Sequence, residues 1–397
     1  MADHDSDDEV QTIAEDIVVT KYKMAAKLVN EILEQVSAKC VEGAKVLELC
    51  EFGDKLLTDG TANVFKKEKE MKKGIAFPTC ISVNNLICHF SPLRSEPDVV
   101  LKNGDVVKID LGAHIDGFAA VVAHTLAVGS SKDKIIEGRL ADVMLAAHYA
   151  SEVAIRMVKP GNENYMVTEA IQKVAEAFKC KPIEGMLSHQ LSKQIIDGEK
   201  AIILNPSEAH RKEHAKCEFD VHEVYALDML ISTGEGKGRE RDAKPTVYKK
   251  SDSTYSLKMK ASRQFFSEMD KKFSTMPFTI RSFEEEKKAK MGVVECLKHD
   301  LVEAFPVLYE RDGETVVQMK FTVLLMPNGP MKITGPTFNP DLYKSEYKIE
   351  DEEINKLLAT SVSRKANKKK KKKAVEQTQA ATTESEDPPQ LVEKPEA

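Results

Sequence analysis

The spacing of apolar residues predicts a long amphipathic helix near the start of the chain. Between residues 13 and 38, apolar side chains recur every three or four positions, and Thr12 with Glu15 three residues later has the form of a capping box. A second helical stretch follows and is expected to end in the charged run 66–73, just before an extended segment around Pro78. The N-terminal part is therefore predicted to be helical before it enters a sheet.

Three further helices are expected from the same kind of pattern. They span about 134–158, about 168–179 with Thr168 as a cap, and a stretch that starts at Ser282 with Glu285 as its box partner. The apolar face of the last helix is expected to consist of Met291, Val294 and Leu297.

Buried-type strands are expected at 106–112, 118–128, 224–230 and 320–326. Asp116-Gly117 joins the first two as a hairpin, and the third leads into the Gly-rich turn 234–238. Strands and helices alternate without the regular rhythm of a parallel sheet. This favours a mixed α+β fold.

Composition narrows the class of protein. The chain has 397 residues, 42% of them apolar, and a formal net charge of -6. Nothing approaches a membrane-spanning run of about 18 apolar residues, and the acidic first ten residues are unlike a secretory signal. The seven cysteines are odd in number and include no Cys-x-x-Cys, which is typical of reduced thiols in an intracellular protein.

Three charged residues stand inside apolar strand patterns, where a buried charge without a partner costs several kcal/mol. They are Asp110, Asp228 and Lys320. Each could face water from its own strand. The coincidence of three such positions favours one shared polar cavity.

The chain also resembles a known family, the type 2 methionine aminopeptidases, whose pita-bread fold is that of peptidase family M24. The matching segments, in family order, are 76–79, 84–85, 89–92, 108–112, 114–117, 188–189, 223–226, 232–234 and 322–325. The resemblance implies a pita-bread domain over about 12–345 with a helical insertion at about 235–305. An acidic leader (1–11), a short helical extension (346–360) and a tail (361–397) would complete the chain.

The resemblance implies that catalytic members of the family use two divalent metals to activate the attacking water. Asp110 and His189 match two metal ligands, and His89 matches a histidine on the substrate side. The place of the second aspartate is Val121, which has no donor atom. Asp228 replaces a glutamate ligand, and Lys320 replaces the bridging glutamate.

Hard dications need several anionic oxygen ligands, so these departures predict that the dinuclear site is lost. Our hypothesis is that Lys320 substitutes for the metal charge by pairing with Asp110 and Asp228. His89 and His189 would then be hydrogen-bonding residues that maintain the fold. No metal, cofactor or catalytic residue is expected.

A retained fold, a degraded site and a Lys-rich tail together resemble the proliferation-associated, ErbB-receptor-binding branch of this family. The resemblance implies a non-catalytic regulator of growth, translation or ribosome biogenesis, and transcription, found in cytoplasm, nucleus and nucleolus. Its partners would be structured RNA including ribosomal RNA, the large ribosomal subunit, and in addition a receptor cytoplasmic region and transcriptional co-regulators. Residues 354–358 lie where relatives carry a Leu-x-x-Leu-Leu motif, but Ile354 replaces its first Leu. One ordinary amphipathic turn explains that segment equally well.

Three basic clusters are candidates for nucleic-acid contact. The tail cluster contains Arg364, Lys365, Lys368, Lys369, Lys370, Lys371, Lys372 and Lys373, and an acidic stretch follows it. Such a run predicts an extended, disordered segment whose binding to phosphates depends on salt and discriminates little between bases. The second cluster contains Lys66, Lys67, Lys69, Lys72 and Lys73, but Glu68 and Glu70 could make it a salt-bridged helix face.

The third cluster lies in the expected insertion and could contact the ribosome. It contains Lys249, Lys250, Lys258, Lys260 and Arg263. Two other functions stay open: a protein adaptor whose empty pocket captures a peptide or receptor tail, and a residual metallo-aminopeptidase.

Overall fold

One large antiparallel sheet organises the protein, and the computed structural model describes residues 11–130 and 135–362 of it. Its strands lie in the order β1 (Lys73–Val83), β3 (Val106–Ile115), β4 (Phe118–Ala127), β15 (Val316–Met326), β9 (Val224–Ser232), β7 (Leu187–Ser192) and β8 (Ile195–Ile203). Two short strands join off this path: β16 (Gly329–Lys332) pairs with β15, and β6 (Lys181–Pro182) pairs with β9. The predicted hairpin at Asp116-Gly117 is the β3–β4 connection.

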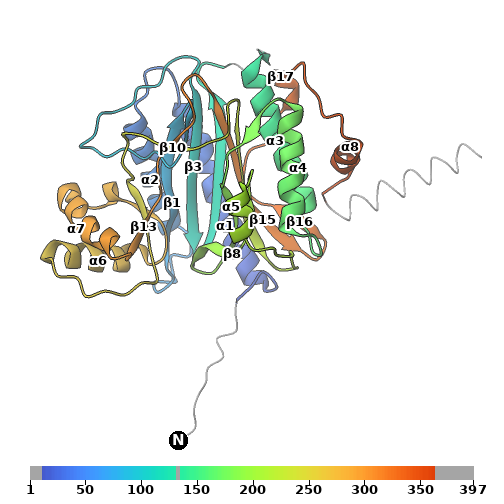
Figure 1. Cartoon of the computed structure of the whole chain (residues 1–397). Coiled ribbons are helices and arrows are strands. Elements are labelled where there is room, and N and C mark those ends of the chain that lie inside the picture. Colours follow the sequence, from blue (N-terminus) through green and yellow to red (C-terminus); the bar gives the residue numbers. More distant parts are fainter. Residues whose placement is uncertain (1–10, 131–134, 363–397) are drawn as a thin grey trace, which may run out of the picture.

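Two helix pairs pack against the sheet over separate hydrophobic clusters (Figure 1). The first pair is α1 (Asp16–Lys39) and α2 (Val46–Ala62), and the second is α3 (Arg139–Met157) and α4 (Asn164–Ala177). α1 and α2 cover β1, β3 and β4, whereas α3 contacts β9 and β15 and α4 contacts β8. The strands at the centre of the sheet are buried along nearly their whole length, which is why they read as continuous apolar runs.

A small unit with its own core lies beside the sheet, at the lower left of Figure 1. It contains β11 (Val247–Lys250), α6 (Lys260–Phe273), β12 (Phe278–Thr279), the 3₁₀ turn Ile280–Ser282, α7 (Glu286–Lys298) and β13 (Val302–Ala304). Its core is aromatic: Phe265, Phe278 and Phe283 pack together within it. These elements lie within the segment where the sequence places a helical insertion.

Short elements complete the described chain. They are β2 (Leu86–Cys88), β5 (Ile136–Glu137), α5 (Glu208–Glu213), β10 (Arg239–Glu240), β14 (Leu308–Tyr309), the 3₁₀ turn Pro340–Leu342, β17 (Tyr343–Lys344) and α8 (Glu352–Ala359). Strands β10, β14 and β2 form a three-stranded sheet, and β17 pairs with β5. Among the described helices, none combines the length and apolar character needed to cross a bilayer.

Several predicted helix boundaries are wrong. α1 begins at Asp16, because the Thr12 hydroxyl accepts from Ala14 and forms no capping box with Glu15. Thr168 lies inside α4, where its hydroxyl donates to the carbonyl of Ile203 at 2.7 Å instead of capping a helix. In each case a longer-range hydrogen bond or a local turn replaced the expected cap.

The predicted helix at Ser282 also begins later, at Glu286, with Glu285 as its N-cap residue. Met291 and Val294 do not form a buried face: they are 57% and 64% exposed. The buried side of α7 contains Ala289 and Val293 instead. Leu297, the third residue of the predicted face, is half-buried and packs against the core of the small unit, so the prediction is wrong for Met291 and Val294 only.

The charged run 66–73 is not helical, which corrects the prediction for that segment. α2 ends at Ala62, and the run forms turns that lead into β1. Among the described residues, no carboxylate pairs with the lysines of this run, so it is not a salt-bridged helix face. Lys66, Lys67, Lys69 and Lys72 are exposed, whereas Lys73 donates to the carbonyls of Val64 and Phe65.

Candidate functional site

Strand register brings the three anomalous charges into one row across the centre of the sheet. Asp110 on β3 lies opposite Ala123 on β4, Ala123 lies opposite Lys320 on β15, and Lys320 lies opposite Asp228 on β9. Directly opposed residues have Cβ atoms about 4.5–5.5 Å apart. Since Ala123 is small, the Lys320 side chain can extend over it to reach Asp110.

The Lys320 ammonium lies between the two carboxylates. Its Nζ is 2.5 Å from Oδ2 of Asp110 and 3.3 Å from Oδ2 of Asp228. Gln318, two residues earlier on the same face of β15, donates from Nε2 to both carboxylate oxygens of Asp228 at 3.0 Å. The hypothesis that a lysine pairs with both aspartates therefore agrees with this geometry, and Gln318 is a member of the group that the sequence did not reveal.

Burial and mutual charge set the protonation of this group. Burial lowers the pKa of Lys320, but Asp110 and Asp228 outweigh it and raise that pKa above its usual value. Burial raises the pKa of Asp228, and the Lys320 charge opposes this shift. Lys320 is therefore a firmly charged ammonium that compensates two buried carboxylates.

In the next row of paired residues across the sheet, an apolar side chain occupies the position where the sequence suggested that a metal ligand was lost. Val121 on β4 lies opposite Gly112, and its backbone N–H and C=O both bond the Thr322 hydroxyl, at 3.0 and 2.9 Å. Further along this row, Ala226 on β9 lies opposite His189 on β7. A side chain at position 112 would place its Cβ 2.8 Å from a Val121 methyl, so the valine fills the space over the glycine.

The family resemblance implies a pair of divalent metals here, and the residues present do not fit them. Among the described residues, no group of three or more His, Cys, Asp or Glu side chains is placed to hold a metal ion. Of the residues matched to metal ligands, Asp110 and His189 each have a buried atom without a hydrogen-bond partner, Oδ1 and Nδ1 respectively, but a lysine ammonium is bonded to the other oxygen of the same aspartate. Two isolated donors beside a fixed cation are a poor site for a hard dication.

His89 is held as a neutral ring in the wall of the same cavity. Its Nδ1 lies 3.1 Å from the carbonyl oxygen of Pro306, and its ring contacts Phe77 and Phe305. Burial and the nearby Lys320 charge lower its pKa to about 4. Burial likewise lowers the pKa of His189.

These groups face a cavity of about 510 Å³. Asp228, Lys320, His89, His189 and Val121 line it, together with apolar side chains including Phe77, Met186, Leu191, Ile196, Phe305 and Leu308. Volumes of about 300–1,000 Å³ are typical of small-molecule sites. The structure thus brings His89, His189, Asp228 and Lys320 together around one cavity, and Asp110 joins them through its ion pair with Lys320.

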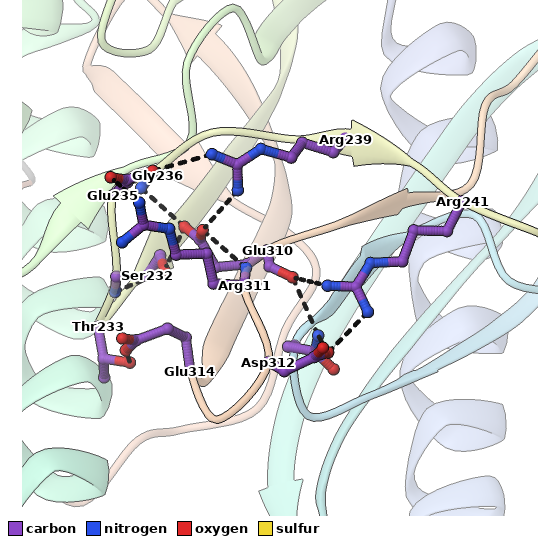
Figure 2. Close-up of polar contacts among 12 residues, drawn as sticks. Ser232, Thr233, Glu235, Gly236, Arg239, Arg241, Glu310, Arg311, Asp312 and Glu314 are labelled. Atoms are coloured by element: carbon purple, nitrogen blue, oxygen red, sulfur yellow. Dashed lines mark hydrogen bonds and ion pairs between the residues drawn. The ribbon is translucent and has the colours of Figure 1, made fainter.

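A separate polar network connects the Gly-rich turn to the segment that follows β14 (Figure 2). The fully buried Glu310 accepts from the Ser232 hydroxyl at 2.9 Å and from the Gly236 N–H at 2.7 Å. Arg241 donates to the Glu310 carbonyl at 3.2 Å and pairs with Asp312 at 2.6 Å. Glu310 was not identified from the sequence, where the glycines at 234–238 were the nearest signal.

The third basic cluster separates into paired and unpaired charges. Lys249 pairs with Asp197 and Glu303, and Lys250 pairs with Asp270. Arg263 donates to the carbonyls of Leu257 and Lys258. Lys258 and Lys260 are exposed, and among the described residues neither side chain has a carboxylate partner within 4 Å. The tail cluster, from Arg364 to Lys373, lies outside the described residues.

The segment 354–358, where relatives carry a Leu-x-x-Leu-Leu motif, is packed against the protein. Ile354 on α8 is 5% exposed, and Leu357 and Leu358 pack on the hydrophobic cluster beneath α3. Lys173 and Asp351 form an ion pair beside α8. These contacts favour the interpretation of residues 354–358 as an amphipathic turn, because its apolar side chains are packed against the rest of the protein.

The sequence matches a known protein family over more than half of its length. Residues 20–236 match the model of metallopeptidase family M24. The chain belongs to this family. It is 48% identical over 367 residues to ERBB-3 binding protein 1 of Arabidopsis thaliana, covering 92% of this chain and 91% of that protein. It is 42% identical over 353 residues to a curved DNA-binding protein of Schizosaccharomyces pombe, covering 88% and 92%.

The solved structure of a thermophilic Arx1 is also similar, with a TM-score of 0.84 and 34% identity over 88% of this chain and 99% of that one. The M24 match and this likeness confirm the pita-bread fold. The relatives confirm the resemblance to the proliferation-associated, ErbB-receptor-binding branch.

Proposed function

We propose that this M24 protein is a non-catalytic regulator that binds structured RNA and the large ribosomal subunit, and that its aminopeptidase-like cavity is inactive. We further propose that it acts in growth control, translation or ribosome biogenesis, and transcription. Its compartments would be the cytoplasm and the nucleus, including the nucleolus. A receptor cytoplasmic region and transcriptional co-regulators are further proposed partners.

The observation that carries the loss of catalysis is the place of the Lys320 ammonium. It lies between Asp110 and Asp228, where hydrolysis by a metal-bound water would need a dication and several anionic ligands. Val121 adds no donor atom on the neighbouring row. A cation fixed by two short contacts excludes a second, divalent cation from the same carboxylates.

Metal content and peptidase activity test this part directly. Purified full chain incubated with Mn²⁺, Co²⁺ or Zn²⁺ is expected to retain no stoichiometric metal and to release no methionine from a Met-Ala-Ser peptide. A Lys320→Glu, Val121→Asp double variant is the matched comparison, because it restores two carboxylates. Two retained ions per unmodified chain together with methionine release would overturn the proposal.

The nucleic-acid part rests on exposed lysines that have no carboxylate partner among the described residues. Lys66, Lys67, Lys69 and Lys72 project from the turns before β1, and Lys258 and Lys260 project from the small unit. Lysines of this kind neutralise phosphates and release counterions, which gives salt-dependent binding with little base readout. The name of one relative, a curved DNA-binding protein, is consistent with a nucleic-acid partner.

Co-sedimentation with large ribosomal subunits across a salt series tests this interface. Lys258→Gln with Lys260→Gln is expected to weaken association and to reduce the slope of log affinity against log salt by about 0.7–0.9 for each phosphate that is no longer neutralised. Lys27→Gln with Lys102→Gln is the control, since it removes the same charge from exposed positions elsewhere. Unchanged affinity and slope in the first variant would refute binding through this cluster.

A protein adaptor function is a second candidate, favoured by the cavity of about 510 Å³ and its apolar wall. In that case a peptide would bind beside Lys320, and RNA would not bind the purified protein. Crosslinking of structured RNA to the full chain and to a truncation at Ser361 separates the two functions. Crosslinks in both forms support the folded part as an RNA-binding surface.

A further inference from the structure

A second cavity lies on the opposite side of the central sheet from Lys320. It has a volume of about 340 Å³ and lies between α3, strands β4 and β15, and the segment 332–338. Met319, Lys320 and Phe321 of β15 all border it, but the Lys320 ammonium lies on the other face of the sheet, where it pairs with Asp110 and Asp228. The two cavities are therefore separated by the sheet.

Three basic side chains line this cavity from three different elements. They are His124 on β4, His148 on α3 and Lys332 at the end of β16. Hydroxyl residues Ser151, Thr334 and Thr337 line it as well. Convergence of basic groups from separate elements is typical of a site that holds an anion.

The one acidic side chain among the described residues that line the cavity is already compensated. Glu152 accepts from Arg156, one turn later on α3, at 2.6 Å. Throughout the part of the chain that the structure describes, no carboxylate lies within 4 Å of the Lys332 ammonium. Lys332 therefore supplies positive charge to the cavity without an ion-pair partner among the described residues.

The position of Lys332 is set by its neighbours. Its Nζ lies 4.5 Å from the centre of the Phe321 ring, and a Cβ added at Gly335 would come within 3.3 Å of it. Gly335 itself has a φ of +95°, and its N–H donates to the Asn30 side chain at 2.9 Å. A glycine at this turn leaves room for the ammonium to face the cavity.

The titratable groups interact across this space. Burial and the Lys332 charge lower the pKa of His124, to about 4. Burial lowers the pKa of His148, with Glu152 opposing the shift and Lys332 and Arg156 adding to it. Burial lowers the pKa of Lys332, and Glu152 opposes it. With their pKa values lowered, the two histidine rings would meet an anion as neutral N–H donors, and Lys332 would supply the positive charge.

We propose that this cavity binds a compact phosphate monoester, with its phosphoryl group between Lys332, His124 and His148. A phosphoryl dianion offers three oxygens, which match three donors that approach from different elements. A single carboxylate offers two oxygens and leaves one donor unused. The volume lies at the lower end of small-molecule sites, which favours a compact ester over a polymer.

The ring wall supports an ester with a small organic part. His148 stacks on Phe338 with 4.5 Å between ring centroids, and Phe338 stacks on Tyr343 at 4.9 Å. This stack holds the His148 ring against an apolar surface, which leaves its edge for hydrogen bonding. The same apolar surface would contact the carbon atoms of the ester.

Isothermal titration of the full chain with inorganic phosphate, phosphoserine and adenosine monophosphate tests the site. We expect saturable binding of at least one of these probes, weakened at least tenfold by Lys332→Met and strengthened by Glu152→Gln. Lys102→Met is the matched control and is expected to leave affinity unchanged, because Lys102 is exposed at a distant turn. His148→Gln serves as a second variant with the same expected loss, in case Lys332→Met unfolds.

Opposite responses of the Lys332 and Glu152 variants are the signature of this cavity. Absence of saturable binding of all three probes at millimolar concentration would overturn the proposal. Equal weakening by Lys332→Met and Lys102→Met would also overturn it, since that result would indicate diffuse binding to surface lysines. This test does not depend on RNA binding or on the state of the Lys320 cavity.

Discussion

Replacing Lys320 by methionine is expected to destabilise the protein strongly at neutral pH. The substitution keeps a flexible apolar stem of similar length and removes the ammonium between Asp110 and Asp228. The side chains of these three residues are 12%, 4% and 12% exposed, so water cannot replace the lost cation. Two carboxylates would then remain buried with Gln318 as their remaining donor.

The distances set the scale of this effect. With an effective dielectric of about 20, separations of 2.5 and 3.3 Å correspond to attractions of about 7 and about 5 kcal/mol. Desolvation of the three ions costs several kcal/mol each and cancels much of this. Removing one partner of a buried pair typically costs about 3–5 kcal/mol, and we expect Lys320→Met to lie in that range.

The sign of the pH dependence gives a sharper test. Without Lys320, burial and the Asp110 charge are unopposed by a cation and raise the folded pKa of Asp228 further above the unfolded value of about 3.9. A carboxylate with a raised folded pKa favours folding as the pH falls, because the folded state then binds more protons. The deficit of Lys320→Met relative to the unmodified protein should therefore be smaller at pH 5 than at pH 8.

Urea unfolding measures this deficit when Lys320→Met and the unmodified protein are compared at pH 5 and at pH 8. The comparison uses the unfolding midpoints, provided that the two proteins have the same dependence of unfolding free energy on urea concentration. Adding Asp110→Asn and Asp228→Asn to Lys320→Met removes all three charges and should recover most of the loss. Lys348→Met, at an exposed position, is expected to change stability by less than about 0.5 kcal/mol. A deficit that is below 1 kcal/mol, or equal at both pH values, would refute the assignment of Lys320 as the counter-ion.

Three further predictions concern the sheet and its surroundings. Lys108 is 1% exposed, and burial lowers its pKa to about 7. Between about pH 7 and 10 the unfolded chain therefore binds more protons than the folded protein, so the melting temperature of the unmodified protein should rise with pH. Lys108→Met should flatten that rise. Gly112→Ala should lower the free energy of unfolding by about 1–3 kcal/mol, because the added methyl group contacts Val121. In a double-mutant cycle, Val121→Ala in the same chain should reduce this loss. Additive losses from the two substitutions would contradict the contact. Ile354→Asp should release α8 and raise its hydrogen exchange, whereas exchange unchanged from the unmodified chain would show that α8 does not depend on this contact.

The central strands β3, β4, β9 and β15 could be predicted from the sequence because they are buried on both faces along most of their length. Continuous apolar runs bounded by turn residues indicate such strands, and the β3–β4 hairpin was identified from Asp116-Gly117 alone. Helix ends were less predictable, as Thr168 illustrates: a threonine that resembles a cap in sequence instead bonds a carbonyl on β8. Local preference of that kind is weak enough for one tertiary hydrogen bond to override it.

The sequence by itself determined that Asp110, Asp228 and Lys320 each needed a partner, since charges inside apolar strands are too costly to leave unpaired. It also determined the family resemblance, and with it the position of Val121 at a former ligand. Only the tertiary structure decided that the three charges compensate one another, because the register of β3, β4, β15 and β9 joins segments far apart in the chain, and the Lys320–Asp110 contact spans 210 residues. The same is true of the second cavity: Lys332, His124 and His148 share no sequence pattern, and the packing of α3 against the sheet brings them together.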